Sequence, residues 1–241
     1  RNTKNKNHHS DRKSQKPKNV MKKLFAIIAL TAISLSCGQA QILVGYWNFN
    51  ALSIATASAP GSGGVPNSIA SDNGAGATLT LAGAWGGLVD DFAGSTINAL
   101  NSDVAGVSLS PLNQTGNGSF IEFSFSMTGL TDVNVTFATR GTGTGFSTGQ
   151  WSYSTDGVGF TDFGVNTATT SSTFALATVG TTTGLDSAST AFLRYTLDGA
   201  SSSTGNNRID NLQITAVPEP TACALFGAGA LFWVIRRKRT A

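Results

Sequence analysis

Short runs of alternating apolar and polar residues fill the stretch 41–217, and they constrain the fold more than any other feature. FIEFSFSM (120–127) and DVNVTFATR (132–140) both alternate with the period of two expected of half-buried strands. The residues predicted to face the core are Ile121, Phe123, Phe125 and Met127 in the first run, and Val133, Val135 and Phe137 in the second. Because only a short turn that contains GLT separates the two runs, we predict that they pair as antiparallel neighbours.

Further short strands are predicted between clusters of Gly, Ser, Asn and Thr. They cover residues 42–49, 77–82, 150–154, 173–178, 191–197 and 208–215. The stretches 55–76 and 179–190 are predicted to be loops, and no helical period occurs within 41–217. Many short strands with frequent turns indicate an all-β domain, an antiparallel β-sandwich of the jelly-roll kind. In the last strand, Arg208 and Asp210 share a face and are expected to pair with each other.

The stretch 41–217 contains no His, Cys or Lys, which excludes most catalytic chemistry. It removes Ser-His-Asp and Cys-His nucleophiles, Schiff-base chemistry and ordinary zinc sites. It also removes the possibility of a disulfide. RGTGTG (140–145) is followed by no helical pattern and is therefore predicted to be a turn rather than a dinucleotide motif. A pair of carboxylates, as in glycoside hydrolysis, is the one catalytic option left, and no two acids stand out.

Charge is distributed unevenly along the chain. Nine of the sixteen basic residues fall within 1–40 and four within 236–239, whereas 41–217 has three basic and eleven acidic residues. An acidic domain of this kind is not expected to bind nucleic acid or another polyanion. Calcium and neutral glycans are compatible with it, and no other cofactor is predicted.

The N-terminal forty residues are predicted to direct export. Residues 1–20 form a basic lead without apolar pattern, expected to be disordered or untranslated. Residues 21–40 have the plan of a secretory signal peptide: Lys22 and Lys23, an apolar run, then Gly38 and Ala40 at a small-x-small cleavage site. The mature protein then begins near Gln41, after passage through the Sec translocon. Lipoprotein processing at Cys37 is the alternative, although Ser34 occupies the position where that signal has Leu.

One local motif resembles a known fold. WSYSTDGVGFTDF (151–163) predicts a hairpin turning at Asp156-Gly157. It is similar to the strand-turn of discoidin-like and other galactose-binding-like jelly rolls, a resemblance that implies ligand binding at rim loops. Asp156 is predicted first as a turn former. The candidate ligand contacts are Trp85, which neighbouring glycines suggest is exposed, together with Asp90, Asp91 and Asp156. Trp47 and Trp151 are the other tryptophans that could stack on a sugar, and core packing is favoured for Trp151.

The C-terminus, 217–241, combines three features: Val-Pro-Glu-Pro, an apolar run at 221–235 and a basic cluster. As a helix the apolar run spans roughly 22 Å at ~1.5 Å per residue, less than the ~30 Å hydrocarbon core. A short stop-transfer anchor is one interpretation. The arrangement also resembles the PEP-CTERM sorting signal of Gram-negative bacteria, which implies recognition and cleavage by an exosortase. The signal residues are then Val217, Pro218, Glu219, Pro220, Arg236, Arg237, Lys238 and Arg239.

These expectations together describe an exported, non-catalytic protein of the cell surface or extracellular matrix. It has a β-sandwich domain at 41–216, flanked by a signal helix and a C-terminal transmembrane helix that anchors it before processing. Its expected partners are the exosortase, the membrane and an extracellular polysaccharide, with glycan or calcium as the ligand. The alternative is a secreted glycoside hydrolase or polysaccharide lyase that uses two carboxylates.

Overall fold

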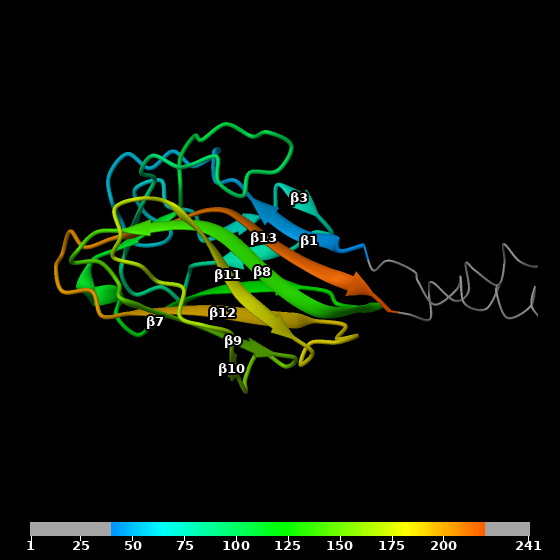
Figure 1. Cartoon of the computed structure of the whole chain (residues 1–241). Helices are drawn as coiled ribbons and strands as arrows, with labels where there is room; N and C mark the ends of the chain where they lie inside the picture. The colour runs from blue at the N-terminus through cyan, green and yellow to red at the C-terminus, as the bar shows by residue number, and fades with distance from the viewer. Residues whose placement is uncertain (1–39, 220–241) are drawn as a thin grey trace, which may run out of the picture. The chain divides into compact units, whose positions relative to one another are not determined.

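A computed structural model describes residues 40–219 of the chain (Figure 1). The expected signal helix, the apolar helix at 221–235 and the basic lead lie outside the described residues. The elements in order are β1 (Ile42–Trp47), β2 (Ser68–Ala70), β3 (Asn73–Gly74), β4 (Thr78–Thr80), β5 (Leu88–Asp90), β6 (Ser110–Leu112), the 3-10 turn η1 (Gln114–Gly116), β7 (Ser119–Phe125), β8 (Leu130–Gly141), β9 (Thr148–Ser154), β10 (Thr161–Phe163), β11 (Ala175–Thr182), β12 (Ala191–Asp198) and β13 (Asn207–Pro218).

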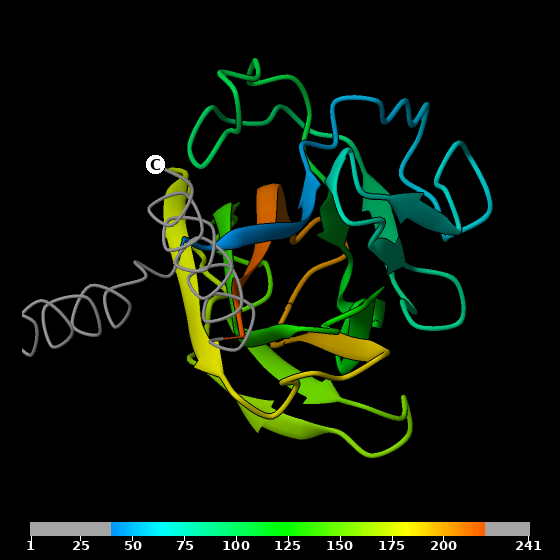
Figure 2. The same ribbon diagram turned by 90° about the vertical axis from the view of Figure 1, so that its right-hand side faces the viewer.

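The strands form two main antiparallel sheets that pack face to face, and this confirms the all-β sandwich. One sheet has the order β11-β8-β13-β1-β3 and the other β10-β9-β12-β7-β4-β2. Strands β5 and β6 form a third, two-stranded sheet. Figure 2, which looks toward the end where β13 leaves the domain, shows the two main sheets as separate layers.

Aromatic side chains occupy the space between the sheets. Trp151 stacks on Tyr195 with ring centroids 4.7 Å apart, and Phe123 lies 5.6 Å from Trp151 on its own sheet. Phe137 reaches Trp151 from the opposite sheet at 5.8 Å. The indole N–H of Trp151 donates to the Thr167 hydroxyl, so the buried polar atom is satisfied. The prediction that Trp151 is a core residue is confirmed.

The predicted pairing of the runs 120–127 and 132–140 is wrong. Strand β7 pairs with β12 and β4, whereas β8 pairs with β13 and β11 in the opposite sheet. The short connection at Gly129 therefore crosses from one sheet to the other instead of forming a hairpin. Both runs still bury the faces that alternation predicts, because those faces meet across the core.

Other strands follow the expected positions. The hairpin predicted at 151–163 is formed by β9 and β10, and Gly157 has a φ of 74° in its turn. The stretch 55–76 is less irregular than expected, since β2 and β3 both lie in it, and β11 extends to Thr182, into the second predicted loop.

A long connection, residues 91–109, is bonded to the outer side of the five-stranded sheet, above β1 and β13 in Figure 1. The buried Tyr46 hydroxyl donates toward Asp103 and Asn211 and accepts from the Leu100 N–H. The Asn211 amide donates to two carbonyls of this connection, at 2.7 and 3.0 Å. Polar side chains therefore attach the connection to the outer side of the sheet, and Leu109 at its end packs into the core.

Candidate functional site

The first residues of the predicted sorting signal belong to the last strand of the sandwich. Val217 pairs with Thr131 and Pro218 with Leu130, and the Glu219 N–H donates to the Gly129 carbonyl at 3.0 Å. Pro218 is therefore part of a sheet, although it has no backbone N–H to donate. Pro218 ends β13, a position at which a sheet tolerates the missing N–H.

The carboxylate of Glu219 also contacts the domain. It accepts a hydrogen bond from the Ser187 hydroxyl, on the turn that follows β11. The Ser187 N–H donates to the Leu130 carbonyl at 2.9 Å, so this turn and the end of β13 are attached to the same segment of β8. The remaining predicted signal residues, Pro220 and Arg236 to Arg239, lie outside the described residues.

The predicted start of the mature protein lies close to this exit. Ala40 and Gln41 are exposed immediately before β1, and Ile42 pairs with Ala216. The third predicted cleavage-site residue, Gly38, lies outside the described residues. Both ends of the sandwich therefore emerge side by side at one end of the five-stranded sheet (Figure 1).

The expectation that Trp85 is exposed is wrong. Its side chain is 4% exposed and its indole N–H donates to the Leu88 carbonyl at 3.0 Å. Neighbouring glycines make room for the ring: a Cβ on Gly116 would lie 2.6 Å from it. Trp47 is also buried, at 0% exposure. Neither tryptophan is available to stack on a sugar.

The carboxylates of Asp90 and Asp91 are engaged by nearby backbone. Asp90 accepts from the Asp91 N–H at 2.9 Å, and Asp91 accepts from the Ile54 N–H at 2.8 Å. The second bond fixes the loop after β1 against the end of β5. Both side chains are half-buried, so the structure gives them a structural role in the sandwich.

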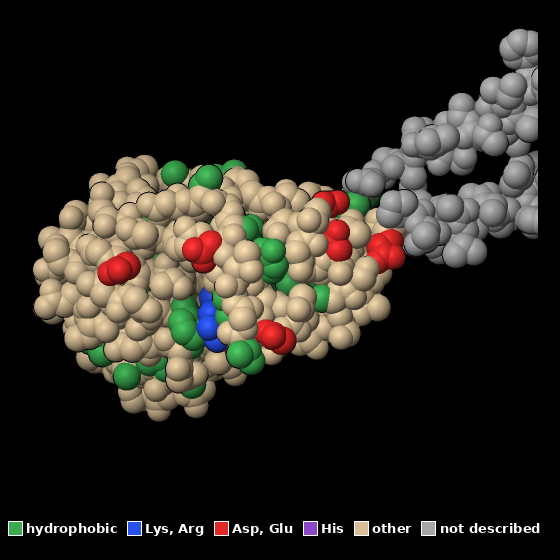
Figure 3. All heavy atoms as spheres, turned by 90° about the horizontal axis from the view of Figure 1, so that it is seen from below, with side chains coloured by type: hydrophobic (Ala, Val, Ile, Leu, Met, Phe, Trp, Pro, Cys, Tyr) green, Lys and Arg blue, Asp and Glu red, His purple; other side chains and the backbone are tan. Residues whose placement is uncertain are grey.

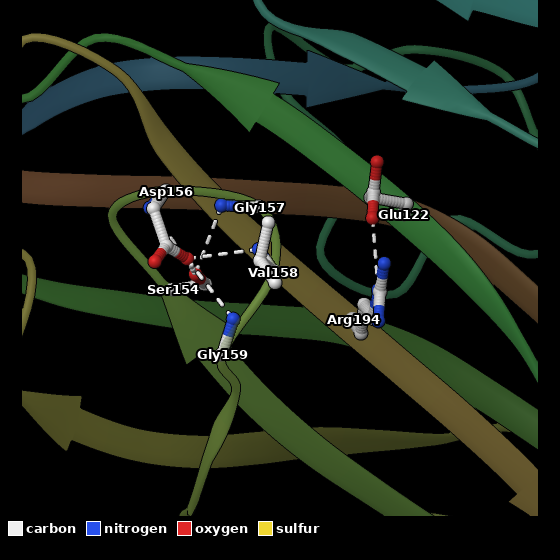
Figure 4. Close-up of polar contacts among 7 residues, drawn as sticks. All are labelled: Glu122, Ser154, Asp156, Gly157, Val158, Gly159 and Arg194. Carbon is white, nitrogen blue, oxygen red and sulfur yellow. Dashed lines mark hydrogen bonds and ion pairs between the residues drawn. The ribbon is translucent and has the colours of Figure 1, made fainter.

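Asp156 is a turn former, as predicted (Figure 4). One of its oxygens accepts from the Ser154 hydroxyl and from the N–H groups of Val158 and Gly159, at 2.8 to 3.0 Å. The pKa of Asp156 lies below its usual value because the Val158 N–H, then the Ser154 hydroxyl and the Gly159 N–H, stabilise the charged form.

The outer face of the six-stranded sheet carries a cluster that the sequence analysis did not find. The Arg194 guanidinium lies between the rings of Phe120 and Phe160, 4.0 and 3.7 Å from their centroids. It also forms an ion pair with Glu122 at 2.8 Å (Figure 4). Figure 3 shows this face, with basic atoms between hydrophobic side chains and the acidic groups scattered. Period-two alternation places Phe120, Glu122 and Arg194 outward, but the loop position of Phe160 carries no such signal.

A buried carboxyl is the second feature that the sequence did not reveal. Asp210 is 0% exposed, and its two oxygens accept from the N–H groups of Ser95 and Asn211 at 2.6 and 2.9 Å. Burial raises its pKa to about 7, and these two hydrogen bonds oppose the rise. The expected pairing with Arg208 is wrong, since that guanidinium donates to the Ala93 carbonyl at 2.9 Å.

Residues 40–219 contain no group of three or more His, Cys, Asp or Glu side chains arranged to hold a metal ion. Within the same range, no helix has the length and apolar character needed to cross a bilayer.

Two solved structures align with about three quarters of this chain at low sequence identity. The CBM22-1 xylan-binding domain from Paenibacillus barcinonensis is 13% identical, with a TM-score of 0.43 over 76% of this chain and 99% of that one. The K3 cleaved adhesin domain of Lys-gingipain from Porphyromonas gingivalis is also 13% identical, with a TM-score of 0.37 over 74% of this chain and 99% of that one. No curated protein matches the chain.

The end of the sequence gives a specific match. Residues 216–239 match the PEP-CTERM protein-sorting motif, which begins in the last described strand and runs to the basic cluster. The chain therefore carries a PEP-CTERM sorting motif at residues 216–239.

Proposed function

We propose that this protein is exported, sorted and cleaved by an exosortase, and delivered to the cell surface or extracellular matrix as a non-catalytic β-sandwich. The observation that carries the proposal is the PEP-CTERM motif at residues 216–239. Before processing, the apolar run at 221–235 holds the chain in the membrane and the basic residues 236–239 stay on the cytoplasmic side.

The position of the motif on the fold supports release of an intact domain. Strand β13 runs into the motif with no linker between them. A cut before Pro218 would require β13 to separate from Thr131 and Leu130 of β8, whereas a cut after Glu219 would leave every described pairing of β13 in place. We therefore place the cleaved bond on the C-terminal side of Glu219.

Export is assigned to residues 21–40, which we propose are removed as a signal peptide after passage through the Sec translocon. The exposed position of Ala40 and Gln41, just ahead of β1, supports cleavage there, because no described strand would be disturbed. N-terminal sequencing of the exported protein should begin near Gln41. A lipidated Cys37 would establish lipoprotein processing instead.

A non-catalytic role agrees with the placement of the carboxyls. The described carboxyl whose pKa is raised toward neutrality, as a general acid requires, is Asp210, and it is fully buried. A substrate cannot reach it without removal of the connection 91–109 that covers it. The inaccessibility of this carboxyl favours the non-catalytic role over the carboxylate-dependent hydrolase or lyase.

For the ligand of the domain we propose a glycan. Export to the surface brings the domain among polysaccharides, and half-buried phenylalanine rings lie beside guanidinium groups on the outer faces of both main sheets. The buried tryptophans take no part in this proposal. Calcium is not proposed, because the described residues offer no cluster of acidic ligands.

The test of sorting compares the full-length protein in its native host with and without the exosortase. An epitope inserted after Ser62, in an exposed turn, reports the size and location of the domain. We expect a shortened protein outside the cell only where the exosortase is present. The same shortened product in both strains would overturn the proposal, and a full-length surface protein in both would establish a plain anchor.

A further inference from the structure

Two of the three arginines of the sandwich lie side by side on its outer surface. Arg140 in β8 and Arg208 in β13 are direct register partners. Both project away from the core, since their neighbours Thr139 and Ile209 are buried on the inner side. Partners of this kind have Cβ atoms roughly 4.5–5.5 Å apart. Two positive groups therefore share one small area of the surface.

This pair is unfavourable unless something neutralises it. Like charges placed directly opposite each other destabilise a sheet. The ion pair found within residues 40–219 joins Arg194 to Glu122, so no described carboxylate is within bonding range of Arg140 or Arg208. The pKa of Arg208 is lowered by burial and, secondarily, by the charge of Arg140. The carboxyl of Asp210, two residues further along β13, accepts from the N–H groups of Ser95 and Asn211 instead of pairing with Arg208.

The hydrogen bonds of Arg208 are also incomplete. One terminal nitrogen donates to the Ala93 carbonyl, but the buried Nε has no partner among the described residues. Two rings border the pair. Phe92 lies 5.0 Å from the Arg208 guanidinium and Phe174 lies 5.8 Å from that of Arg140. The two rings come from separate loops and reduce the access of water to the guanidinium groups. A charge interaction made by these groups is therefore stronger than it would be in water.

We propose that Arg140 and Arg208 together bind one oxyanion group, a carboxylate or a sulfate, carried on a sugar of the glycan. The inference rests on the glycan part of the proposed function and is independent of sorting. Guanidinium groups present paired N–H donors that match the oxygens of such an anion. A single anion between them converts their repulsion into attraction. The acidity of the whole domain disfavours a densely charged polymer, so the ligand is an acidic sugar within a largely neutral chain.

The location of the pair suits a tethered protein. Arg208 stands at the beginning of β13 and Pro218 at its end, roughly 33 Å apart at ~3.3 Å per residue. The pair therefore lies at the opposite end of the sheet from the sorting motif (Figure 1). While the chain is held through the motif before cleavage, this end of the domain is open to a polysaccharide, and cleavage after Glu219 leaves it open.

The test measures the melting temperature of the full-length protein in detergent with added ligand at constant ionic strength. D-galacturonate and galactose 6-sulfate are compared with D-galactose and inorganic phosphate. A bound acidic sugar should raise Tm by about 3–6 °C when its concentration is about ten times the dissociation constant. Arg140→Gln should abolish this shift and raise the Tm of the ligand-free protein. Ser62→Ala, which changes an exposed turn and leaves all three arginines of the sandwich in place, should retain the shift.

The outcomes separate the two sources of the anion. A shift with galacturonate assigns a carboxylated sugar, and a shift with galactose 6-sulfate assigns a sulfated one. The proposal is overturned if galactose gives an equal shift, if phosphate alone acts, or if Arg140→Gln responds like the wild type. If the protein is sorted normally but no acidic sugar raises its Tm, only the proposed anion site is refuted, because the Tm measurement does not depend on processing.

Discussion

Replacement of Asp210 by Asn should change how the stability of the sandwich depends on pH. The Asp210 carboxyl is fully buried beneath the connection 91–109 and accepts only from the backbone N–H groups of Ser95 and Asn211. The described residues place no cation against it, because Arg208 points to the Ala93 carbonyl. Only these two hydrogen bonds oppose the effect of burial, so the pKa of Asp210 rises from 3.8 to about 7.

The size of the effect follows from this rise. A folded state that binds the proton more tightly than the unfolded state loses stability as pH increases. The contribution is fully present below about pH 4 and is lost as pH rises through about 7. Each unit of pKa difference corresponds to about 1.4 kcal/mol, so the loss is on the order of 4 kcal/mol. Asn has no proton to lose over this range, so the Asp210→Asn variant should not show this loss of stability.

The assay is denaturant unfolding of wild type and Asp210→Asn between pH 4 and pH 8. The difference in unfolding free energy between the two proteins should move in favour of the variant by about 4 kcal/mol across this range. Comparing the two proteins cancels the titration of the other carboxyls. A difference that stays constant with pH would refute the reasoning, because it would mean that the buried carboxyl keeps an ordinary pKa.

Two further pairs of substitutions test the packing. Phe125→Ala should cost on the order of 3–5 kcal/mol of unfolding free energy, because its side chain is buried between the sheets, whereas Ser124→Ala on the outer face should cost little. Equal small costs at both positions, measured by denaturant unfolding, would contradict the orientation of β7. Gly141→Ala should lower Tm strongly, since a Cβ there collides with the Thr169 carbonyl; Gly143→Ala has open space and should leave Tm nearly unchanged. Similar Tm values for both glycine variants would show that the loop before β11 adapts.

The fold class could be predicted because alternation is a local property of the sequence. The faces of β7 and β8 were correct even though their pairing was wrong. A connection as short as the one at Gly129 is compatible with a hairpin or with a crossing between sheets. The choice depends on β12 and β13, which supply the actual partners from much later in the chain. Such long-range pairing leaves no mark on the short turn itself.

The details of the sites were harder to predict, for two physical reasons. Arg208 and Asp210 are two residues apart on one strand, but the ladder shifts register just after Asp210, where Asn211 adopts a φ of 47°. Their side chains accordingly find different partners. Glycines around Trp85 suggested exposure, whereas close approach to Gly116 is what buries the ring. The sorting motif was recognisable because its parts are contiguous in the sequence.

The most direct test of the central claim is the processing of Glu219→Ala in the native host. If residues 216–239 are a sorting signal, the variant should stay full-length at the membrane while the wild type is shortened and released to the surface. Ser187→Ala is the matched control, because it removes the same hydrogen bond to the domain but keeps the carboxylate. It should be processed normally. The epitope inserted after Ser62 reports the size and location of the protein for both variants. Normal shortening of Glu219→Ala would contradict the account and leave residues 217–241 as a plain membrane anchor.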